Sequence, residues 1–300
     1  MVCSRHCALS DVSYLVDHHA SIDLCLHPIH LTAHNAAATR RAGPGAVREL
    51  IGARELLWSF VERDLIVRYR TPIMGIAWAL ATPLLQMAMF TVVFTRVARV
   101  DVGMPYPLYA YIGLAAWTLT AAALREATSS LSSNAVLVTK VSFPRAVLPI
   151  AAVCTALMDF AVAMLLAAVL LWYYDVGIGL AALLLPLVLL VQLAFTAALA
   201  LLLAAANLFW QDVRHLFDLF IGVWMFATAV VYPVQRAGGR LGEILTLNPM
   251  THIIEAYRDV LVRDRALDAG FGMVALVSLA VLAGAWTVFR RSERRFAELA

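Results

Sequence analysis

The sequence has little charge. Only 14% of its 300 residues are charged, whereas 62% are hydrophobic and the mean hydropathy is +0.81. A soluble domain carries about 25% charged and roughly 45–50% apolar residues. The composition therefore excludes an ordinary water-soluble domain and predicts an all-α, polytopic membrane protein.

Enzyme motifs are also missing. The sequence contains no GxxxxGK[ST] phosphate loop, no HExxH and no GxSxG. We therefore expect no catalytic residues and no P-loop binding of ATP in this chain. The energy for any transport would come from a partner or from an ion gradient.

Cysteine is sparse and shows no paired spacing, so no disulfide framework is expected. The four cysteines are Cys3, Cys7, Cys25 and Cys154. Residues 1–45 hold three of them and six of the eight histidines. The spacing of Cys25, His27, His30 and His34 matches no standard zinc pattern, so we predict a poorly ordered extension without a metal site. No continuous apolar region follows a basic start, so no cleavable signal peptide is expected.

Residues 46–72 are predicted to form an amphipathic helix that lies in the membrane surface. Trp58, Val61, Leu65 and Tyr69 recur at helical spacing. Polar residues occupy another face, namely Glu55, Ser59, Glu62, Arg63 and Arg70. The helix should end before Pro72. The alternative, a surface helix of a soluble domain, is disfavoured because no soluble domain of useful size precedes it.

Six segments are long enough to cross about 30 Å of hydrocarbon, at roughly 20 residues each. They are approximately 75–95, 107–127, 146–172, 180–206, 214–233 and 270–289, within a six-helix transmembrane region of residues 73–295. Six crossings place both termini on one side. The flanks on that side carry 12 Lys or Arg residues against seven on the other, which predicts cytoplasmic termini.

The longest connection, about 234–269, is predicted to form one or two short external helices. Asn248 can cap a helix whose first residue is Pro249, and Gly238-Gly239 is the expected turn. The expected apolar stripe consists of Ile253, Ile254, Tyr257, Val260 and Leu261. Its expected polar face consists of Glu255, Arg258 and Asp259.

The loop 134–145 is polar, contains the only lysine, Lys140, and ends in Phe143-Pro144-Arg145. Such a segment cannot lie in hydrocarbon, because its charges and open backbone groups would each cost several kcal/mol. We predict that it lies in the cytoplasm and receives a mechanical input from a separate soluble motor.

Ionisable residues inside the spans are few. Asp159 lies near the middle of the third span, and the polar but neutral Gln192 lies near the middle of the fourth. An intramembrane acid is a functional candidate by default. A lone acid favours a structural role, either a hydrogen bond to a neighbouring helix or a pair with Arg125. Arg125 and Glu126 are expected to pair with each other or with the following loop.

Aromatic residues recur on two spans. Tyr106, Tyr109 and Trp117 share a face with Gly113, and Phe217, Phe220 and Trp224 share a face of the fifth span. Such rings could offer stacking surfaces to sugars. The alternative is an interfacial aromatic belt. The hypothesis places Tyr109, Trp117, Phe220 and Trp224 along a substrate pathway.

Several short motifs resemble the permease subunits of ABC transporters that export polysaccharides, such as O-antigen, capsule and teichoic-acid exporters. In the first third they are Glu62-Arg63-Asp64-Leu65, Arg68-Tyr69-Arg70, Gly75-Ile76-Ala77-Trp78, Pro83-Leu84-Leu85, Tyr106-Pro107, Gly113 and Trp117. They continue with Ser133-Asn134, Lys140, Phe143-Pro144-Arg145, Leu148-Pro149, Asn207, Asp212-Val213-Arg214, Tyr232-Pro233 and Asn248-Pro249-Met250. The resemblance covers about residues 50–295.

The resemblance implies a type-2 exporter half with six spans, an interface helix carrying Glu62, Arg63, Arg68 and Arg70, and short external helices before the last span. It implies a permease rather than an enzyme, with a second copy of itself and two ATP-binding subunits that hold ATP and Mg²⁺. The other expected partners are membrane lipid and a glycan substrate, with no nucleic acid among them. The expected location is the bacterial plasma (inner) membrane.

The resemblance assigns the ATPase contact to two segments. Their residues are Lys140, Phe143, Pro144 and Arg145 in the first, and Asp212 and Arg214 in the second. Phe143 would act as an apolar knob, Lys140 and Arg145 would steer it, and Pro144 would stiffen the connection to the third span.

Two rival functions remain open. One is a drug or lipid exporter of the same superfamily, against which the aromatic faces weigh. The other is a gradient-driven transporter, which is expected to show several membrane-embedded acids, whereas Asp159 is nearly alone.

Overall fold

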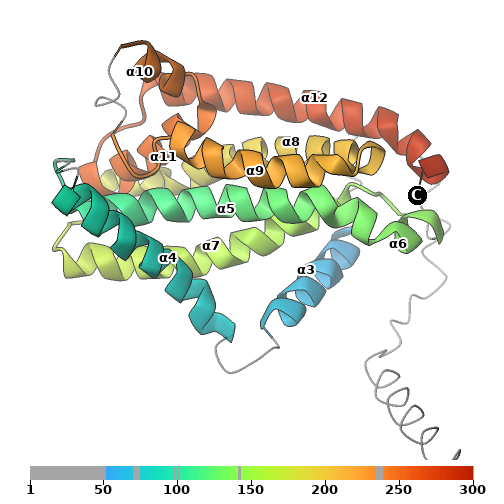
Figure 1. The fold of residues 1–300 in the computed structure, drawn as a ribbon, viewed down its shortest axis with the longest axis horizontal. Helices are drawn as coiled ribbons and strands as arrows, with labels where there is room; N and C mark the ends of the chain where they lie inside the picture. Colours follow the sequence, from blue (N-terminus) through green and yellow to red (C-terminus); the bar gives the residue numbers. More distant parts are fainter. Residues whose placement is uncertain are drawn as a thin grey trace, which may run out of the picture. The chain divides into compact units, whose positions relative to one another are not determined.

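The computed structural model of the chain describes residues 52–69, 75–97, 99, 102–140, 143–233 and 239–299 (Figure 1). The chain divides into two units, Met1–Pro44 and Gly45–Ala300, and only the second contains described residues. The expectations for residues 1–45 and for Arg70 therefore lie outside the described residues. Within the described ranges the regular structure is entirely helical, as the composition predicts.

Among the described residues, four helices are long and apolar enough to cross a membrane. They are α5 (Tyr106–Ser133), α7 (Val147–Tyr173), α8 (Leu185–Phe209), which follows the 3₁₀ turn η3 (Leu180–Leu184), and α12 (Ala269–Leu299). Two shorter apolar helices accompany them: α4 (Gly75–Val92), continued by the π turn η2 (Val93–Val97), and α9 (Asp212–Ala227). A multi-pass helical membrane protein is confirmed, and the count of six crossings stays a prediction.

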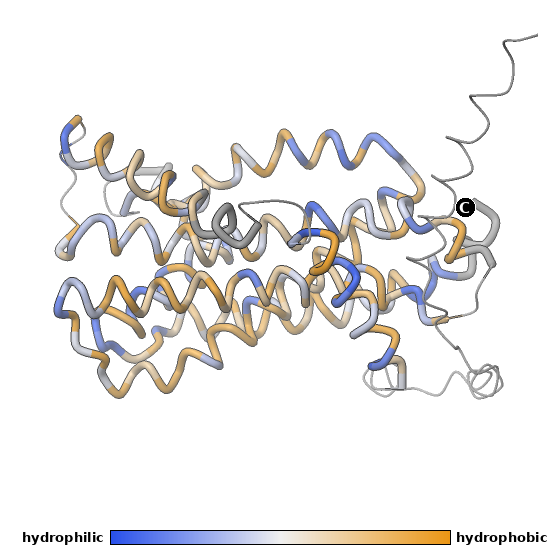
Figure 2. Tube along the Cα trace, turned by 90° about the horizontal axis from the view of Figure 1, so that it is seen from below, coloured by the Kyte–Doolittle hydropathy of each residue, from blue (hydrophilic) through white to orange (hydrophobic). Residues whose placement is uncertain are grey.

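Helix α5 is the centre of the bundle. It packs against α7 on one side and α8 on the other, and α12 packs against α8. Small residues such as Ala110, Gly113 and Ala116 let the neighbouring backbones approach α5 closely. Its most apolar stretch is 83% buried, whereas that of α12 is 22% buried. Figure 2 shows long hydrophobic stretches along the helices, which suit contact with lipid on the outside.

Short helical elements lie at each of the two ends of the bundle. One end of the bundle carries α6 (Ala135–Lys140), and α12 also finishes there (Figure 1). The opposite end carries α10 (Gly239–Thr246), α11 (Pro249–Arg258) and the π turn η5 (Asp259–Arg263). We call these the α6 end and the α11 end.

The capping prediction for α11 is confirmed. The Asn248 side-chain oxygen accepts a hydrogen bond from the Met250 amide at 3.1 Å, and Pro249 is the first helical residue. The predicted apolar stripe from Ile253 to Leu261 is buried throughout, because α11 packs against α5, α8 and α12. Gly239 is the first residue of α10, and Gly238 is outside the described residues.

The polar face predicted for α11 is partly wrong, because Arg258 is fully buried. Its guanidinium donates to Glu255 at 2.6 Å and to the Val230 carbonyl. The carbon of the guanidinium lies 3.6 Å from the centre of the Tyr109 ring. A buried arginine needs this kind of pairing, which helical periodicity does not reveal.

Helix α3 (Arg54–Tyr69) occupies the stretch predicted to be amphipathic. It packs against α7 and buries Phe60 and Val61. Trp58, assigned to the same apolar stripe as Val61, is 57% exposed, so the buried face is rotated away from the predicted one. The position of α3 in the membrane surface stays a prediction.

Candidate functional site

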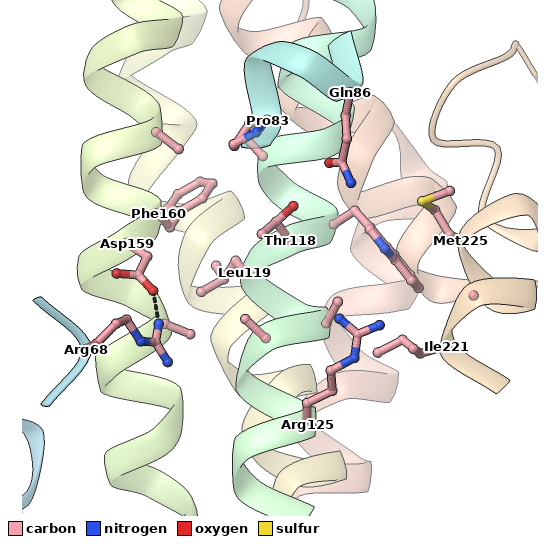
Figure 3. A pocket seen from close by; sticks show the side chains of 17 residues that line it. Arg68, Pro83, Gln86, Thr118, Leu119, Arg125, Asp159, Phe160, Ile221 and Met225 are labelled. Carbon is pink, nitrogen blue, oxygen red and sulfur yellow. Dashed lines mark hydrogen bonds and ion pairs between the residues drawn. The ribbon is translucent and has the colours of Figure 1, made fainter. Parts of the chain in front are cut away.

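A cluster of charged side chains joins three helices inside the bundle. Arg68 of α3 bonds to Glu126 of α5 and to Asp159 of α7, and the Tyr69 hydroxyl donates to Asp159. Figure 3 shows Arg68 reaching across to Asp159. We call Arg68, Glu126 and Asp159 the Arg68 bridge. It fixes the carboxyl-terminal end of α3 to the spans.

The bridge corrects the expected partner of Asp159. The predicted alternative of a bond to a neighbouring helix is confirmed, but the partner is Arg68, not Arg125. Arg125 faces α9, with its Nε 3.5 Å from Asp218 Oδ1. Arg125 and Glu126 do not pair either, because adjacent helical residues point in different directions.

The Tyr69 hydroxyl is held in its protonated form. Burial, the hydrogen bond to Asp159 and the charge of Asp159 raise the pKa of Tyr69 to about 12. The phenol therefore keeps its proton at neutral pH and serves as a donor to the carboxylate.

Two pockets flank the Arg68 bridge. The first, which we call the tryptophan pocket, has a volume of about 380 Å³ (Figure 3). Its lining is Arg68, Pro83, Gln86, Ala115, Trp117, Thr118, Leu119, Ala121, Ala122, Arg125, Ala156, Asp159, Phe160, Ala163, Ile221, Gly222 and Met225. Most of these side chains are apolar. Such a lining suits a ligand that gives up its water shell or stacks on an aromatic ring.

The second pocket, which we call the serine pocket, lies toward the α6 end and has a volume of about 530 Å³. Its lining is Phe60, Arg63, Asp64, Val67, Arg68, Glu126, Ser129, Ser130, Ser133, Asn134, Leu148, Ala151 and Ala152. Eight of these thirteen residues carry hydroxyl, amide or charged groups. The pocket therefore offers hydrogen bonds of the kind that a hydroxylated ligand takes.

Three of the four predicted pathway aromatics come together. The Trp117 and Trp224 rings meet edge to face at 5.3 Å, and Phe220 lies 5.7 Å from Trp224. Trp117 lines the tryptophan pocket, and Phe220 is 54% exposed. Tyr109 lies elsewhere, fully buried beneath Arg258. A substrate role for these rings stays a prediction.

The residues predicted for the first ATPase contact are bound to the rest of the chain. The ring of Phe143 lies 6.2 Å from that of Phe60 on α3. The Arg145 guanidinium donates to the Glu293 carbonyl at 2.6 Å and to the Val138 carbonyl at 3.2 Å. The loop is thus connected to both α3 and α12. Pro144 follows Phe143 directly, and the Lys140 side chain lies outside the described residues.

The second predicted contact lies at the start of α9. Asp212 and Arg214 are exposed there. The Arg214 amide donates to Asn207 at 3.1 Å, and the Asn207 side chain donates to Ser132 of α5 at 3.2 Å. This α8–α9 corner is therefore joined to the end of α5, close in sequence to α6.

Sequence reasoning missed the charged cluster around α11. Arg263 bridges Glu255 at 2.8 Å and Asp259 at 2.7 Å. Burial alone would raise the pKa of Glu255, but Arg258 and Arg263 outweigh it and hold that pKa below its usual value. Burial by itself would lower the pKa of Arg263. The hydrogen bonds from Arg263 to Asp259 and Glu255 outweigh that effect and raise its pKa.

Gly113 of α5 gives Arg258 its room. A Cβ at Gly113 would lie 2.6 Å from the Val230 carbonyl and would also meet the guanidinium. Tyr109 and Gly113 are four residues apart on one helical face, which is the sequence signal that could have pointed to a buried partner here.

A bundle with four helices long and apolar enough to cross a membrane, among the described residues, defines the class as a multi-pass helical membrane protein. The family comparison then assigns it. Residues 55–262 match the family described as ABC-2 type transporter, and the chain belongs to this family.

The relatives of known name are permeases. An O-antigen export system permease protein RfbA from Myxococcus xanthus is 34% identical over 255 residues, which cover 84% of this chain and 98% of that protein. A protein of the same name from Klebsiella pneumoniae is 25% identical over 246 residues, covering 82% of this chain and 95% of its own length. The family expected from the short motifs is confirmed.

Proposed function

We propose that the chain is the permease subunit of an ATP-driven exporter that moves a polysaccharide or lipid-linked glycan outward across the inner membrane. The observation that carries this proposal is the match to an O-antigen export permease over 98% of that protein's length. A match of this extent includes α5, α7, α8, the α6–α7 loop and most of α11. The hydroxyl-lined serine pocket and the ring-lined tryptophan pocket both suit a carbohydrate.

The proposal includes the assembly. Two copies of the chain would surround the pathway within membrane lipid, and two copies of a separate ATPase subunit would bind ATP and Mg²⁺. Both chain termini and the α6 end would face the cytoplasm. The distribution of arginine and lysine supports this orientation.

The α6 end is proposed as the ATPase contact. Lys140, Phe143, Pro144 and Arg145 would form the first contact, and Asp212 and Arg214 the second. The bonds of this loop to α3 and α12 give a physical route for the force. A partner that displaces Phe143 would also displace Phe60, and with it the helix that supplies Arg68.

The test is reconstitution with the ATPase. We expect the chain to co-purify with its cognate ATPase and to raise its rate of ATP hydrolysis in lipid vesicles. Phe143→Ala with Arg145→Glu should abolish that stimulation, whereas Trp172→Ala, an exposed residue at the opposite end of α7, should preserve it. Stimulation that persists in the double variant would contradict the contact assignment, and a chain that never binds the ATPase would contradict the proposed function.

A further inference from the structure

One stripe of α5 is not covered by its neighbours. All of α5 is described, and its exposed residues are Thr118, Arg125 and, at its end, Ser133. Thr118 and Arg125 are seven residues apart, which is about two turns, so they lie on the same face of the helix. The partly exposed Ala122 lies between them. The uncovered stripe of this otherwise buried helix therefore carries two polar side chains.

Helix α9 borders this stripe. On α9, Asp218 and Gly222 are exposed and Met225 is partly exposed, and their spacing places them on one face. Gly222 and Met225 line the tryptophan pocket together with Thr118 and Arg125. A Cβ at Gly222 would meet nothing within 4 Å, so the pocket is open there. We call Thr118, Arg125, Asp218, Gly222 and Met225 the Arg125 face.

Arg125 and Asp218 form a loose ion pair between the two helices. The Arg125 Nε lies 3.5 Å from Asp218 Oδ1, and the two side chains are 53% and 49% exposed. Figure 3 shows Arg125 on α5 and Ile221 on α9 at the same end of the tryptophan pocket. An exposed ion pair of this length contributes little to stability. Stability therefore does not explain why two charges lie here.

The pair lies well inside the bundle. Arg125 lines the same pocket as Asp159, which is near the middle of α7. Asp218 lies about 9 Å along α9 from its first residue, Asp212, at a rise of 1.5 Å per residue. An aspartate side chain is too short to reach the membrane surface from that depth. Because hydrocarbon does not solvate charges, the Arg125 face must meet water or protein rather than lipid.

The neighbouring face of α9 has the opposite character. Leu219, Val223 and Phe226 are each more than half exposed, and they lie beside Asp218 on the helical surface. An exposed apolar face of this kind suits contact with lipid. Helix α9 thus has one side for lipid and one for a polar environment, as expected of a helix between lipid and an aqueous pathway.

We propose that Arg125 and Asp218 bind hydroxyl groups of the glycan at the mouth of the tryptophan pocket, on the face that each copy turns toward the pathway between two copies. The inference rests on the proposed function and names residues that bind its substrate. The Asp218 carboxylate accepts hydrogen bonds from sugar hydroxyls, and the Arg125 guanidinium donates to their oxygens. Trp117 lines the same pocket and offers a ring on which a sugar packs.

The opposite charges of the pair favour a neutral sugar over an acidic one. Arg125 alone would attract a carboxylate or a phosphate, but Asp218 beside it repels a second negative charge. Arg125 uses its Nε toward Asp218, so the remaining N–H groups of the guanidinium are left for a ligand. The chemical class that fits is therefore a chain of neutral sugars with neighbouring hydroxyl groups.

Cysteine labelling tests which surroundings the Arg125 face meets. In the complete transporter with its native cysteines replaced, Gly222→Cys lies on the Arg125 face and Val223→Cys on the apolar face. A charged thiol reagent that cannot cross membranes is applied to both sides of vesicles. We expect Gly222→Cys to react at least about tenfold faster, because only a thiol in water ionises readily to the reactive thiolate. Equal rates, or a faster reaction at Val223→Cys, would overturn the assignment.

Replacing both charges separates a binding role from a structural one. Arg125→Met with Asp218→Leu leaves no unpaired charge, and apolar contacts can replace an ion pair that only holds two helices together. A purely structural pair therefore predicts normal export. Glycan binding predicts that export falls at least about tenfold, because hydrogen bonds to charged groups are lost. Co-purification with the ATPase shows that the variant is folded, and the labelling test does not depend on this variant.

The matched control changes two exposed residues of the apolar face. Leu219→Ala with Val223→Ala should change export by less than about twofold. If the parent exports glycan and Arg125→Met with Asp218→Leu exports it equally well, the inference is wrong and the proposed function stands. If the parent binds an active ATPase and exports no glycan, the proposed function itself is contradicted.

Discussion

At the scale of single residues, the buried arginine of α11 has the largest expected effect on stability. The Arg258 guanidinium donates hydrogen bonds to Glu255 and to the Val230 carbonyl and stacks on the Tyr109 ring. The Arg258 side chain is fully buried. Removing one partner of such a group leaves the others unsatisfied in a dry environment. The cost of that is usually larger than the net gain from the intact pair.

We predict that Arg258→Gln lowers the free energy of unfolding by about 3–5 kcal/mol, the usual cost of breaking a buried ion pair. Arg265→Gln changes an exposed arginine of the same segment and should cost less than about 0.5 kcal/mol. Thermal unfolding in detergent measures both. Equal stability of the two variants would contradict the account of Arg258.

The pH dependence follows from Glu255. Its pKa in the folded protein lies below the usual 4.5, so its contribution to stability is complete above that value. We expect that contribution to be lost as the pH falls through the lowered pKa. In Glu255→Gln the loss should be smaller over the same acidic range. Parallel acid unfolding curves for the parent and the variant would contradict this.

The paired tryptophans give a test of function. Replacing Trp117 and Trp224 together by phenylalanine keeps aromatic stacking, whereas replacing both by alanine removes it. We expect export of glycan to survive the first change and to fall at least about tenfold with the second, because alanine leaves no ring surface on which a sugar can pack. Trp172→Ala, at an exposed position, is the control. Unchanged export in the double alanine variant would remove these rings from the pathway.

At the scale of elements, the connection between the α6–α7 loop and α3 is the feature on which coupling depends. Phe60 and Phe143 form the aromatic contact between them. We predict that Phe60→Ala reduces ATP-driven export about as much as Phe143→Ala, and that the double variant is no worse than either. Effects of residues that act as one unit do not add.

Trp58→Ala changes an exposed residue of the same helix and should leave export intact. Normal export in Phe60→Ala with failed export in Phe143→Ala would mean that Phe143 acts only by contacting the partner. In that case α3 would not carry the force.

The sequence predicts some of these elements well. The long apolar runs locate α5, α7, α8 and α12, because length and hydropathy suffice when the solvent is hydrocarbon. Asn248-Pro249 locates the start of α11, because capping chemistry is local. The observed α5 runs six residues beyond the predicted span end at 127, since its last two turns contain serines that remain helical outside an apolar run.

The candidate site was less predictable. The partners of Asp159 and Arg258 lie in other segments of the chain, 91 residues away at Arg68 on α3 and 28 residues away at the Val230 carbonyl, which follows α9. Periodicity tells which residues share a face of one helix, but it does not tell which helix packs against that face. The exposure of Trp58 and the isolation of Tyr109 from the other pathway rings have the same cause.

At the scale of the whole molecule, the account depends on which end faces the cytoplasm. Val136 on α6 is 64% exposed and Leu247 beside α11 is 81% exposed. With a cysteine at one of these positions, an impermeant thiol reagent should label Val136→Cys only in inverted vesicles. It should label Leu247→Cys only in right-side-out vesicles. The reverse pattern would contradict the charge count and the proposed ATPase contact.

The central claim is that this chain and an ATPase together move a glycan outward. The direct measurement uses inverted membrane vesicles that contain the transporter and its lipid-linked glycan substrate. On addition of ATP, the glycan should become enclosed and resistant to an added glycosidase, and it should stay accessible when the ATPase lacks its catalytic carboxylate. ATP-independent enclosure, or none with an active ATPase that binds the chain, would contradict the account.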